Sequence, residues 1–257
     1  MDRLADLLVI LKEPRSQAAE SYRGVRTSLQ RALANDVKTI MFVSCFAGDG
    51  KSMVCANVAV ALSQLFLDVI LVDGDLRRPT LTSLFDASDM AGLSDCLTGN
   101  AELEQVLVAT PIDRLRFLPA GQAAENPGNL LGRPSVASFC SSVSRLADAV
   151  VIDTSPLAAC NDAISLGQHI DTTVMVVSPR RWDGDVEVKI RQNLEHHKVP
   201  LMGVVLNGAS SAKKAGYGYG YGYGAQGQEL YTYGYEEGPR PAKKGFWSSL
   251  KGLLGTE

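Results

Sequence analysis

The feature that most constrains the fold of this chain is a glycine-bearing loop between an apolar run and a helical pattern. Residues 39–43 read Thr-Ile-Met-Phe-Val, residues 44–52 read Ser-Cys-Phe-Ala-Gly-Asp-Gly-Lys-Ser, and a helical pattern follows over residues 53–65. In such a strand, loop and helix unit, backbone N–H groups close on phosphate oxygens, and the helix N-terminus adds the positive end of its dipole. The unit therefore predicts a nucleoside triphosphate site.

Individual side chains of this loop have separate predicted roles. Lys51 supplies a point charge to the phosphates, and Ser52 offers an oxygen to Mg²⁺. Cys45 holds the place of the first glycine, so the strict loop pattern is not met, and a tight structural turn is the alternative interpretation. The residues predicted to bind the nucleotide within the loop are Gly48, Asp49, Gly50, Lys51, Ser52 and Met53.

Two further apolar runs end in acidic residues. Residues 69–72 are followed by Asp73 and Asp75, and residues 149–152 are followed by Asp153. Because the carboxyl ends of parallel strands lie on one edge of a sheet, these carboxylates should converge there with the phosphate-binding loop. Each Asp taken singly is also a common helix cap. Mg²⁺ takes only one or two direct protein ligands. The candidate metal ligands are Ser52, Asp73 and Asp153.

Several stretches carry a resemblance to a known family. Residues 70–79, Ile-Leu-Val-Asp-Gly-Asp-Leu-Arg-Arg-Pro, and residues 150–156, Val-Val-Ile-Asp-Thr-Ser-Pro, are similar to the second Walker-type motif and the Walker B motif of the bacterial tyrosine kinases (BY-kinases) of capsule and exopolysaccharide synthesis. Residues 20–27 resemble the family's Glu-x-x-Arg-x-x-Arg oligomerisation motif, and residues 92–99 and 118–127 resemble its middle segments. The resemblance covers about residues 14 to 210. It departs from the family pattern at Phe46, Ala47 and Ser155, none of which replaces a group that touches phosphate or metal.

The resemblance implies a P-loop NTPase fold of the α/β class, with a mostly parallel sheet flanked by helices. It implies a kinase domain over residues 1–210 that transfers the γ-phosphate of ATP to a tyrosine hydroxyl with Mg²⁺ as cofactor. Asp73 is expected to face the incoming phenol and Asp75 to orient waters on the metal. Asn207 ends a predicted strand where relatives hold adenine, although a strand-ending Asn is also a common turn former. The implied catalytic residues are Lys51, Asp73, Asp75 and Asp153.

The resemblance also implies partners. Glu20, Arg23 and Arg26, on a helix at about residues 16–34, imply a homo-oligomeric ring, with an octamer as the candidate size. No apolar run approaches the ~20 residues that cross a bilayer, so the transmembrane activator, a polysaccharide co-polymerase, is expected to be a separate chain. A cognate tyrosine phosphatase is expected to reverse the reaction. The expected location is cytoplasmic, peripheral at the inner face of the cell membrane through the activator.

The composition changes abruptly beyond Ser210, where glycine and tyrosine alternate. Such a sequence cannot build a core, because every second residue lacks a side chain, so residues 211–257 are predicted to form a disordered tail. One interpretation of this composition is a low-complexity linker. In a chain that also carries the kinase motifs, the tail resembles the tyrosine cluster that the family phosphorylates on itself. An extended chain from Asn207 reaches at most ~33 Å at Tyr217 and ~90 Å at Tyr235, enough to enter a neighbouring site. The predicted phosphoacceptors are Tyr217, Tyr219, Tyr221, Tyr223, Tyr231, Tyr233 and Tyr235.

Charge and composition limit the remaining possibilities. A net charge of −3 argues against a nucleic-acid partner recruited by bulk charge. From Ser211 onward six basic and four acidic residues give a net charge of +2, which seven phosphates would change to roughly −8 to −12. The tail ends in a short amphipathic segment, residues 246–254, suited to an anionic membrane surface, to a partner, or to capping the tail.

Two rival functions stay open from the sequence. A partitioning or site-placing ATPase of the same broad fold would transfer the phosphate to water, but such proteins carry an extra loop lysine where this chain has Phe46 and Ala47. An ATP-binding oligomeric scaffold or co-polymerase regulator would keep most of the same residues without phosphate transfer.

Overall fold

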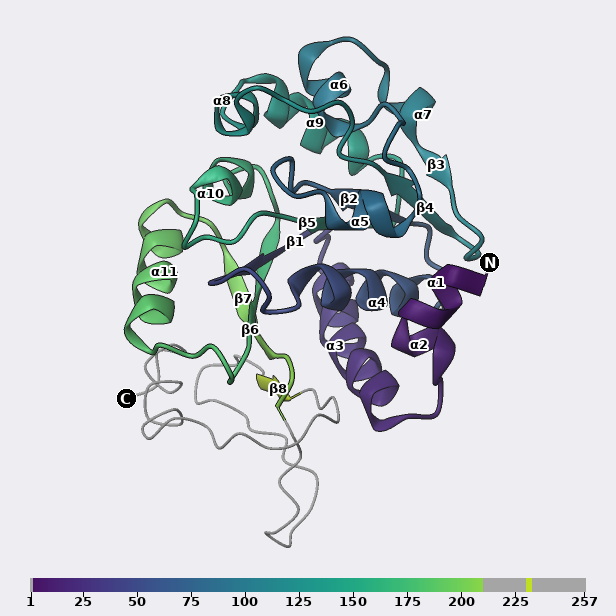
Figure 1. Ribbon diagram of the computed structural model, residues 1–257, viewed down its shortest axis with the longest axis vertical. Coiled ribbons are helices and arrows are strands. Elements are labelled where there is room, and N and C mark those ends of the chain that lie inside the picture. The colour runs from purple at the N-terminus through teal and green to yellow at the C-terminus, as the bar shows by residue number, and fades with distance from the viewer. Residues whose placement is uncertain (1, 210–229, 233–257) are drawn as a thin grey trace, which may run out of the picture.

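The computed structural model describes residues 2–209 and 230–232 (Figure 1). An eight-stranded sheet in the order β3-β4-β2-β5-β1-β6-β7-β8 runs through these residues. All neighbouring strands are parallel except β3 and β4. The strands are β1 (Thr39–Ser44), β2 (Val69–Asp73), β3 (Val108–Ala109), β4 (Leu115–Leu118), β5 (Ala149–Asp153), β6 (Thr172–Val177), β7 (Leu201–Leu206) and β8 (Leu230–Thr232).

Helices cover both faces of the sheet, as Figure 1 shows. They are α1 (Asp2–Leu7), α2 (Val9–Lys12), α3 (Gln17–Leu33), α4 (Lys51–Ser63), α5 (Thr80–Leu84), α6 (Leu93–Thr98), α7 (Leu103–Val106), α8 (Pro127–Leu131), α9 (Ser135–Val143), α10 (Asp162–Gly167) and α11 (Asp185–His196). One apolar core lies between the sheet and α2–α5, and a second core lies between the sheet and α6–α11. The predicted α/β fold with a mostly parallel sheet flanked by helices is confirmed.

The central strands and α4 form the most deeply buried part of the fold. Every residue of β1, β2 and β5 is buried, which is typical of parallel strands with both faces covered. In α4, every residue from Val54 to Ser63 is buried, because the helix lies between the sheet and α3 and is apolar on all sides. The first residue of α4 is Lys51, so this core helix fixes the position of the phosphate-binding loop.

The N-terminal helix predicted at about residues 16–34 is α3. Ser16 caps it by accepting a hydrogen bond of 3.1 Å from the Ala19 N–H. None of the helices in the described part of the chain is long and apolar enough to cross a membrane.

The C-terminal region differs from the sequence prediction at one place. Residues 230–232, which the sequence assigns to the disordered tail, form β8 and pair in parallel with Val204–Leu206 of β7. An extended Leu-Tyr-Thr segment can add to β7 because a sheet edge offers unpaired N–H and C=O groups. Tyr231 therefore lies in a strand. The predicted disorder of the other tail residues, the amphipathic segment at residues 246–254, and Tyr217, Tyr219, Tyr221, Tyr223, Tyr233 and Tyr235 lie outside the described residues.

Candidate functional site

The phosphate-binding loop joins β1 to α4 and has a backbone that only glycine adopts readily. Gly48 and Gly50 have φ angles of 84° and 83°, in the left-handed region. The Asp49 side chain ties the loop together by accepting a hydrogen bond of 2.8 Å from the Phe46 N–H. Burial raises the pKa of Asp49 to about 6, although the Phe46 N–H and Arg181 oppose the rise. The loop is therefore held in shape by its own residues, as a phosphate cradle requires.

Lys51 and Asp153 form a buried ion pair at the carboxyl edge of the sheet. The exposed fractions of their side chains are 5% and 0%, and Lys51 Nζ donates to Asp153 Oδ1. Burial alone would lower the pKa of Lys51, but the Asp153 carboxylate raises it above its ordinary value. Burial raises the pKa of Asp153, while Lys51 and Ser52 oppose that rise. An unpaired charge out of water is costly, so the burial of each of these two charges depends on the other.

Asp153 has a free ligand atom. Its Oδ2 is buried and has no hydrogen-bond partner among the described residues. The Ser52 hydroxyl lies within hydrogen-bonding reach of the same carboxylate, and this contact opposes the rise in the pKa of Asp153. A carboxylate oxygen and a hydroxyl, with waters and phosphate oxygens completing the shell, are the donor set that Mg²⁺ takes in such sites. The residues present therefore fit the ion, and no larger metal cluster of His, Cys, Asp and Glu occurs in the described part of the chain.

Asp73 lies next to Asp153 but is already used within the fold. The two residues are register partners in β2 and β5. Asp73 Oδ2 accepts hydrogen bonds from the Thr82 N–H at 2.7 Å and the Thr82 hydroxyl at 2.8 Å, which anchors α5. Burial and the neighbouring Asp153 raise the pKa of Asp73 to about 7, although the Thr82 donors oppose them. Thr82 was not found from the sequence, because its contact with Asp73 depends on how α5 turns back on β2.

Asp75 is held by a residue that departs from the family pattern. Its Oδ1 accepts a hydrogen bond of 2.6 Å from the Ser155 hydroxyl, and also accepts from the Arg77 and Arg78 N–H groups at 3.3 Å and 3.1 Å. Both Asp75 and Ser155 are buried. Ser155 thus joins the ends of β2 and β5, a role that the sequence did not indicate.

Asn207 follows β7 and reaches the phosphate-binding loop. Its Nδ2 donates a hydrogen bond of 2.9 Å to the Asp49 carbonyl, and a Cβ on Gly50 would lie 1.9 Å from that nitrogen. The structure thus brings Asn207 to the site as a support of the loop, and its contact with adenine stays a prediction. Met53, in the first turn of α4, packs against the apolar core.

Arg77, which follows Asp75, forms an ion pair within the chain. The Arg77 guanidinium pairs with Asp162, with Nε 2.5 Å from Oδ2. Of the alternatives that the sequence leaves for Arg77, which are phosphate, a neighbour or solvent, the structure shows an ion pair within the chain.

The predicted oligomerisation residues lie on α3, away from the phosphate-binding loop. Glu20 and Arg23 form an exposed pair at 3.1 Å, and Arg23 also donates to the Pro14 carbonyl at 2.7 Å. Arg26 Nε is buried without a hydrogen-bond partner among the described residues, and burial and the nearby Arg23 lower the pKa of Arg26. Part of this motif is therefore unsatisfied within one chain.

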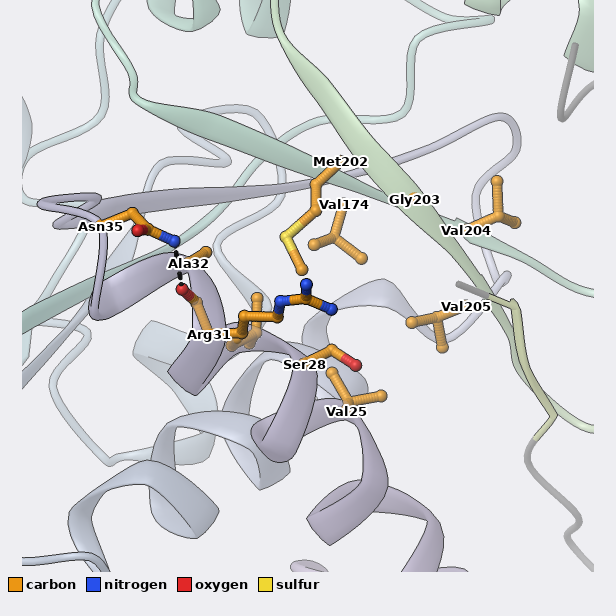
Figure 2. Close-up of a pocket in the computed structure, with 11 residues that line it drawn as sticks. Val25, Ser28, Arg31, Ala32, Asn35, Val174, Met202, Gly203, Val204 and Val205 are labelled. Carbon is orange, nitrogen blue, oxygen red and sulfur yellow. Dashed lines mark hydrogen bonds between the residues drawn. The ribbon is translucent and has the colours of Figure 1, made fainter. Parts of the chain in front are cut away.

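A separate hollow lies between α3 and the strands β6 and β7, and Figure 2 shows the residues around it. Its volume is about 280 Å³, and its walls include Val25, Leu29, Val174, Met202 and Val205. The side chains around it are mainly apolar, and none of the residues predicted to bind nucleotide or metal lines it. The hollow is therefore separate from the predicted nucleotide and metal site.

Comparisons with known proteins agree with this geometry. The family described as ParA, NUBPL iron-transfer P-loop NTPase, matches residues 36–229. The chain is 32% identical over 216 residues to the tyrosine-protein kinase YwqD of Bacillus subtilis (strain 168), covering 84% of this chain and 91% of YwqD.

Two solved structures have the same fold. The kinase domain of the Escherichia coli tyrosine kinase ETK has a TM-score of 0.76 and 29% identity, covering 83% of this chain and 84% of that one. The septum site-determining protein MinD of Pyrococcus horikoshii OT3, solved with Mg-ADP, has a TM-score of 0.59 and 25% identity, covering 68% of this chain and 72% of that one.

Proposed function

The chain belongs to the bacterial tyrosine kinases within the ParA-type P-loop NTPases, and from this premise we propose that it phosphorylates its own C-terminal tyrosines with ATP and Mg²⁺. This autophosphorylation would regulate the polymerisation and export of a capsule or exopolysaccharide. The observation that carries the proposal is the meeting of the phosphate-binding loop, Lys51 and the Asp153 carboxylate at one sheet edge.

The tyrosines themselves support the choice of acceptor. The chain has eight tyrosines, and seven of them follow Ser210. The eighth, Tyr22, belongs to α3, is only 3% exposed and packs in the apolar core. A phenol in that position cannot enter an active site without local unfolding. Self-modification of the folded chain therefore falls on the tail.

Residues at the sheet edge have distinct proposed tasks. ATP with Mg²⁺ would supply the phosphoryl group, and Ser52 and Asp153 would hold the ion. Lys51 leaves Asp153 to neutralise the β and γ oxygens, while the N–H groups of the loop orient the phosphates. Asp75, whose carboxylate is held by the Ser155 hydroxyl, would orient waters on the metal.

The transfer step needs one proton acceptor. The tyrosine oxygen forms a bond to the γ phosphorus as the bond to the β–γ bridging oxygen breaks, and the phenol proton passes to Asp73. A pKa of about 7 brings Asp73 closer to the phenol pKa near 10 than an ordinary carboxylate would be. The burial of Asp73 thus makes this carboxylate a better acceptor of the phenol proton than an ordinary Asp would be.

The assembly that we propose follows from α3. The exposed Glu20–Arg23 pair and the unpartnered Arg26 Nε favour a second copy of the chain against this helix, in a ring that brings one tail to the next site. A separate transmembrane activator would place the kinase at the inner face of the cell membrane, and a tyrosine phosphatase would reverse the modification. No nucleic acid takes part.

The experiment that tests the function separates three reactions. The purified chain is incubated with ATP and Mg²⁺, alone and with the cytoplasmic tail of a candidate activator, beside a Lys51→Met variant. Phosphate added to the tail in the wild type but not in the variant, by intact mass, is the expected result. Inorganic phosphate without protein modification would favour a MinD-like ATPase, and bound ATP without either product would favour a scaffold.

A further inference from the structure

The loop between β6 and α11 is rigidly framed beside the phosphate-binding loop. Trp182 is buried, and the Arg181 N–H donates to the Ser178 carbonyl at 2.9 Å. The Glu187 carboxylate, also buried, accepts from the Asp183 N–H at 3.2 Å and the Gly184 N–H at 2.7 Å, closing the start of α11. These contacts fix the backbone on both sides of Arg181, so the Cα of Arg181 is held beside the phosphate-binding loop.

The Arg181 guanidinium lies directly over Gly48. A Cβ on Gly48 would be 2.8 Å from Arg181 Nη2 and 3.0 Å from Cζ, so the guanidinium packs directly against the glycine. The same cation opposes the rise in the pKa of the neighbouring Asp49. The side chain itself is exposed, which leaves the guanidinium free to move toward an incoming anion.

We propose that Arg181 is a further phosphate-binding residue, which contacts the γ-phosphate of ATP from above Gly48 and stabilises its charge during transfer. The inference rests on the proposed ATP site. Loop N–H groups before the lysine cradle the phosphates in this class of fold, so a cation over Gly48 lies on the side where the γ-phosphate must sit. Lys51, the cation within the phosphate-binding loop itself, is the first residue of α4.

A cation at Arg181 would compensate for the lack of charge at two residues of the phosphate-binding loop. Phe46 and Ala47 supply no charge to the phosphates. The transition state of phosphoryl transfer spreads negative charge over three oxygens, and an arginine in the same chain can neutralise it. The planar guanidinium fork also matches two phosphate oxygens at once, which a lysine does not. Arg181 therefore supplies from another loop the charge that this phosphate-binding loop lacks.

Nucleotide affinity tests the inference without relying on catalysis. Full-length wild type, Arg181→Ala and Arg181→Lys are titrated calorimetrically with Mg-ADP and with a non-hydrolysable Mg-ATP analogue. Arg180→Ala is the matched control, because Arg180 is the exposed neighbour in the same loop. We expect Arg181→Ala to weaken the analogue about 10-fold or more and ADP less than about 3-fold, as for one charge-assisted contact to the γ-phosphate. Arg181→Lys should fall between the wild type and Arg181→Ala.

The other outcomes are equally definite. Equal weakening of ADP and the analogue, or an Arg180→Ala variant that behaves like Arg181→Ala, would overturn the contact with the γ-phosphate. Unchanged affinities in Arg181→Ala would overturn it as well. Thermal unfolding of each variant verifies that the fold is retained. A wild type that binds neither nucleotide would instead refute the proposed function, so the two failures can be distinguished.

Discussion

The carboxyl edge of the sheet and the outer surface of α3 both carry charged side chains, but they use them in opposite ways. At the sheet edge the side chains of Lys51 and Asp153 are 5% and 0% exposed and neutralise each other. On α3 the side chains of Glu20 and Arg23 are 74% and 26% exposed, and such surface pairs contribute at most about 1 kcal/mol to stability. The first set is paired within one chain, whereas the second is the surface that we propose to contact another copy of the chain. Four experiments test this difference between the two regions.

The largest effect is expected from Lys51→Met. The variant removes the cation that we propose neutralises the β and γ oxygens, so we expect autophosphorylation to fall at least about 100-fold. The Asp153 carboxyl left behind can take up a proton, because burial already raises its pKa, and the fold should survive. Initial rates of phosphotyrosine formation measure the effect. The control is Arg114→Met, which removes the cation of an exposed pair with Asp68. Similar rates in the two variants would contradict an internally built site.

A smaller effect is expected from Ser155→Ala. The variant removes the 2.6 Å hydrogen bond that holds Asp75, and a hydrogen bond to a charged group is typically worth about a 10-fold change. We expect kcat to fall by about that factor, with nucleotide affinity nearly unchanged and partial rescue by Ser155→Thr. Ser144→Ala, which removes a hydroxyl bonded to the Ser141 carbonyl, is the control. A wild-type kcat in Ser155→Ala would show that Asp75 needs no support from β5.

Substitutions on the α3 surface should change the assembly of the chain and leave its nucleotide affinity nearly unchanged. We expect the triple substitution of Glu20, Arg23 and Arg26 by Ala to lower the mass in solution, measured by light scattering. Nucleotide affinity should stay within about 2-fold of wild type, because surface pairs contribute little to the fold. Substitution of Arg191 and Glu195, an exposed pair on α11, gives the matched control. An unchanged mass, or a lost nucleotide site, would remove the contrast between the two regions.

The smallest effect is a pH dependence of stability that belongs to the sheet edge. The pKa of Asp73 in the folded protein, about 7, is above the ordinary value near 3.9, so the folded state binds the proton more tightly than the unfolded state. The resulting stabilisation is complete below the unfolded value and is lost as the pH rises through 7. In nucleotide-free protein, the melting temperature should therefore decrease as the pH rises from about 4 to about 7 and level off above about pH 8. The decrease should be smaller in Asp73→Asn, and equal slopes would show that Asp73 does not titrate there.

The sequence predicted the parts of the site that lie in continuous motifs. Lys51 and Ser52 follow a recognisable loop, and Asp73 and Asp153 each end an apolar run, so the parallel sheet had to bring them together. The contacts between motifs were not predictable, because they join residues far apart in the chain. Ser155 and Asp75 are 80 positions apart, and Asn207 and Asp49 are 158 apart.

The tail shows a different limit of sequence analysis. Residues 230–232 have strand-forming side chains, but only a free edge such as that of β7 decides whether they pair. The alternation of glycine and tyrosine that surrounds them gave no signal for this strand. Backbone pairing across a sheet edge depends on the neighbour, and a single sequence does not contain that information.

The most direct test of the central claim is a site-resolved count of phosphate on the chain after incubation with ATP and Mg²⁺. Wild type is compared with a variant in which the seven tyrosines after Ser210 are replaced by Phe, leaving only the buried Tyr22. We expect phosphate on the tail tyrosines of the wild type and none above background on the variant. Equal phosphate on both proteins, or phosphate found only in solution, would contradict it.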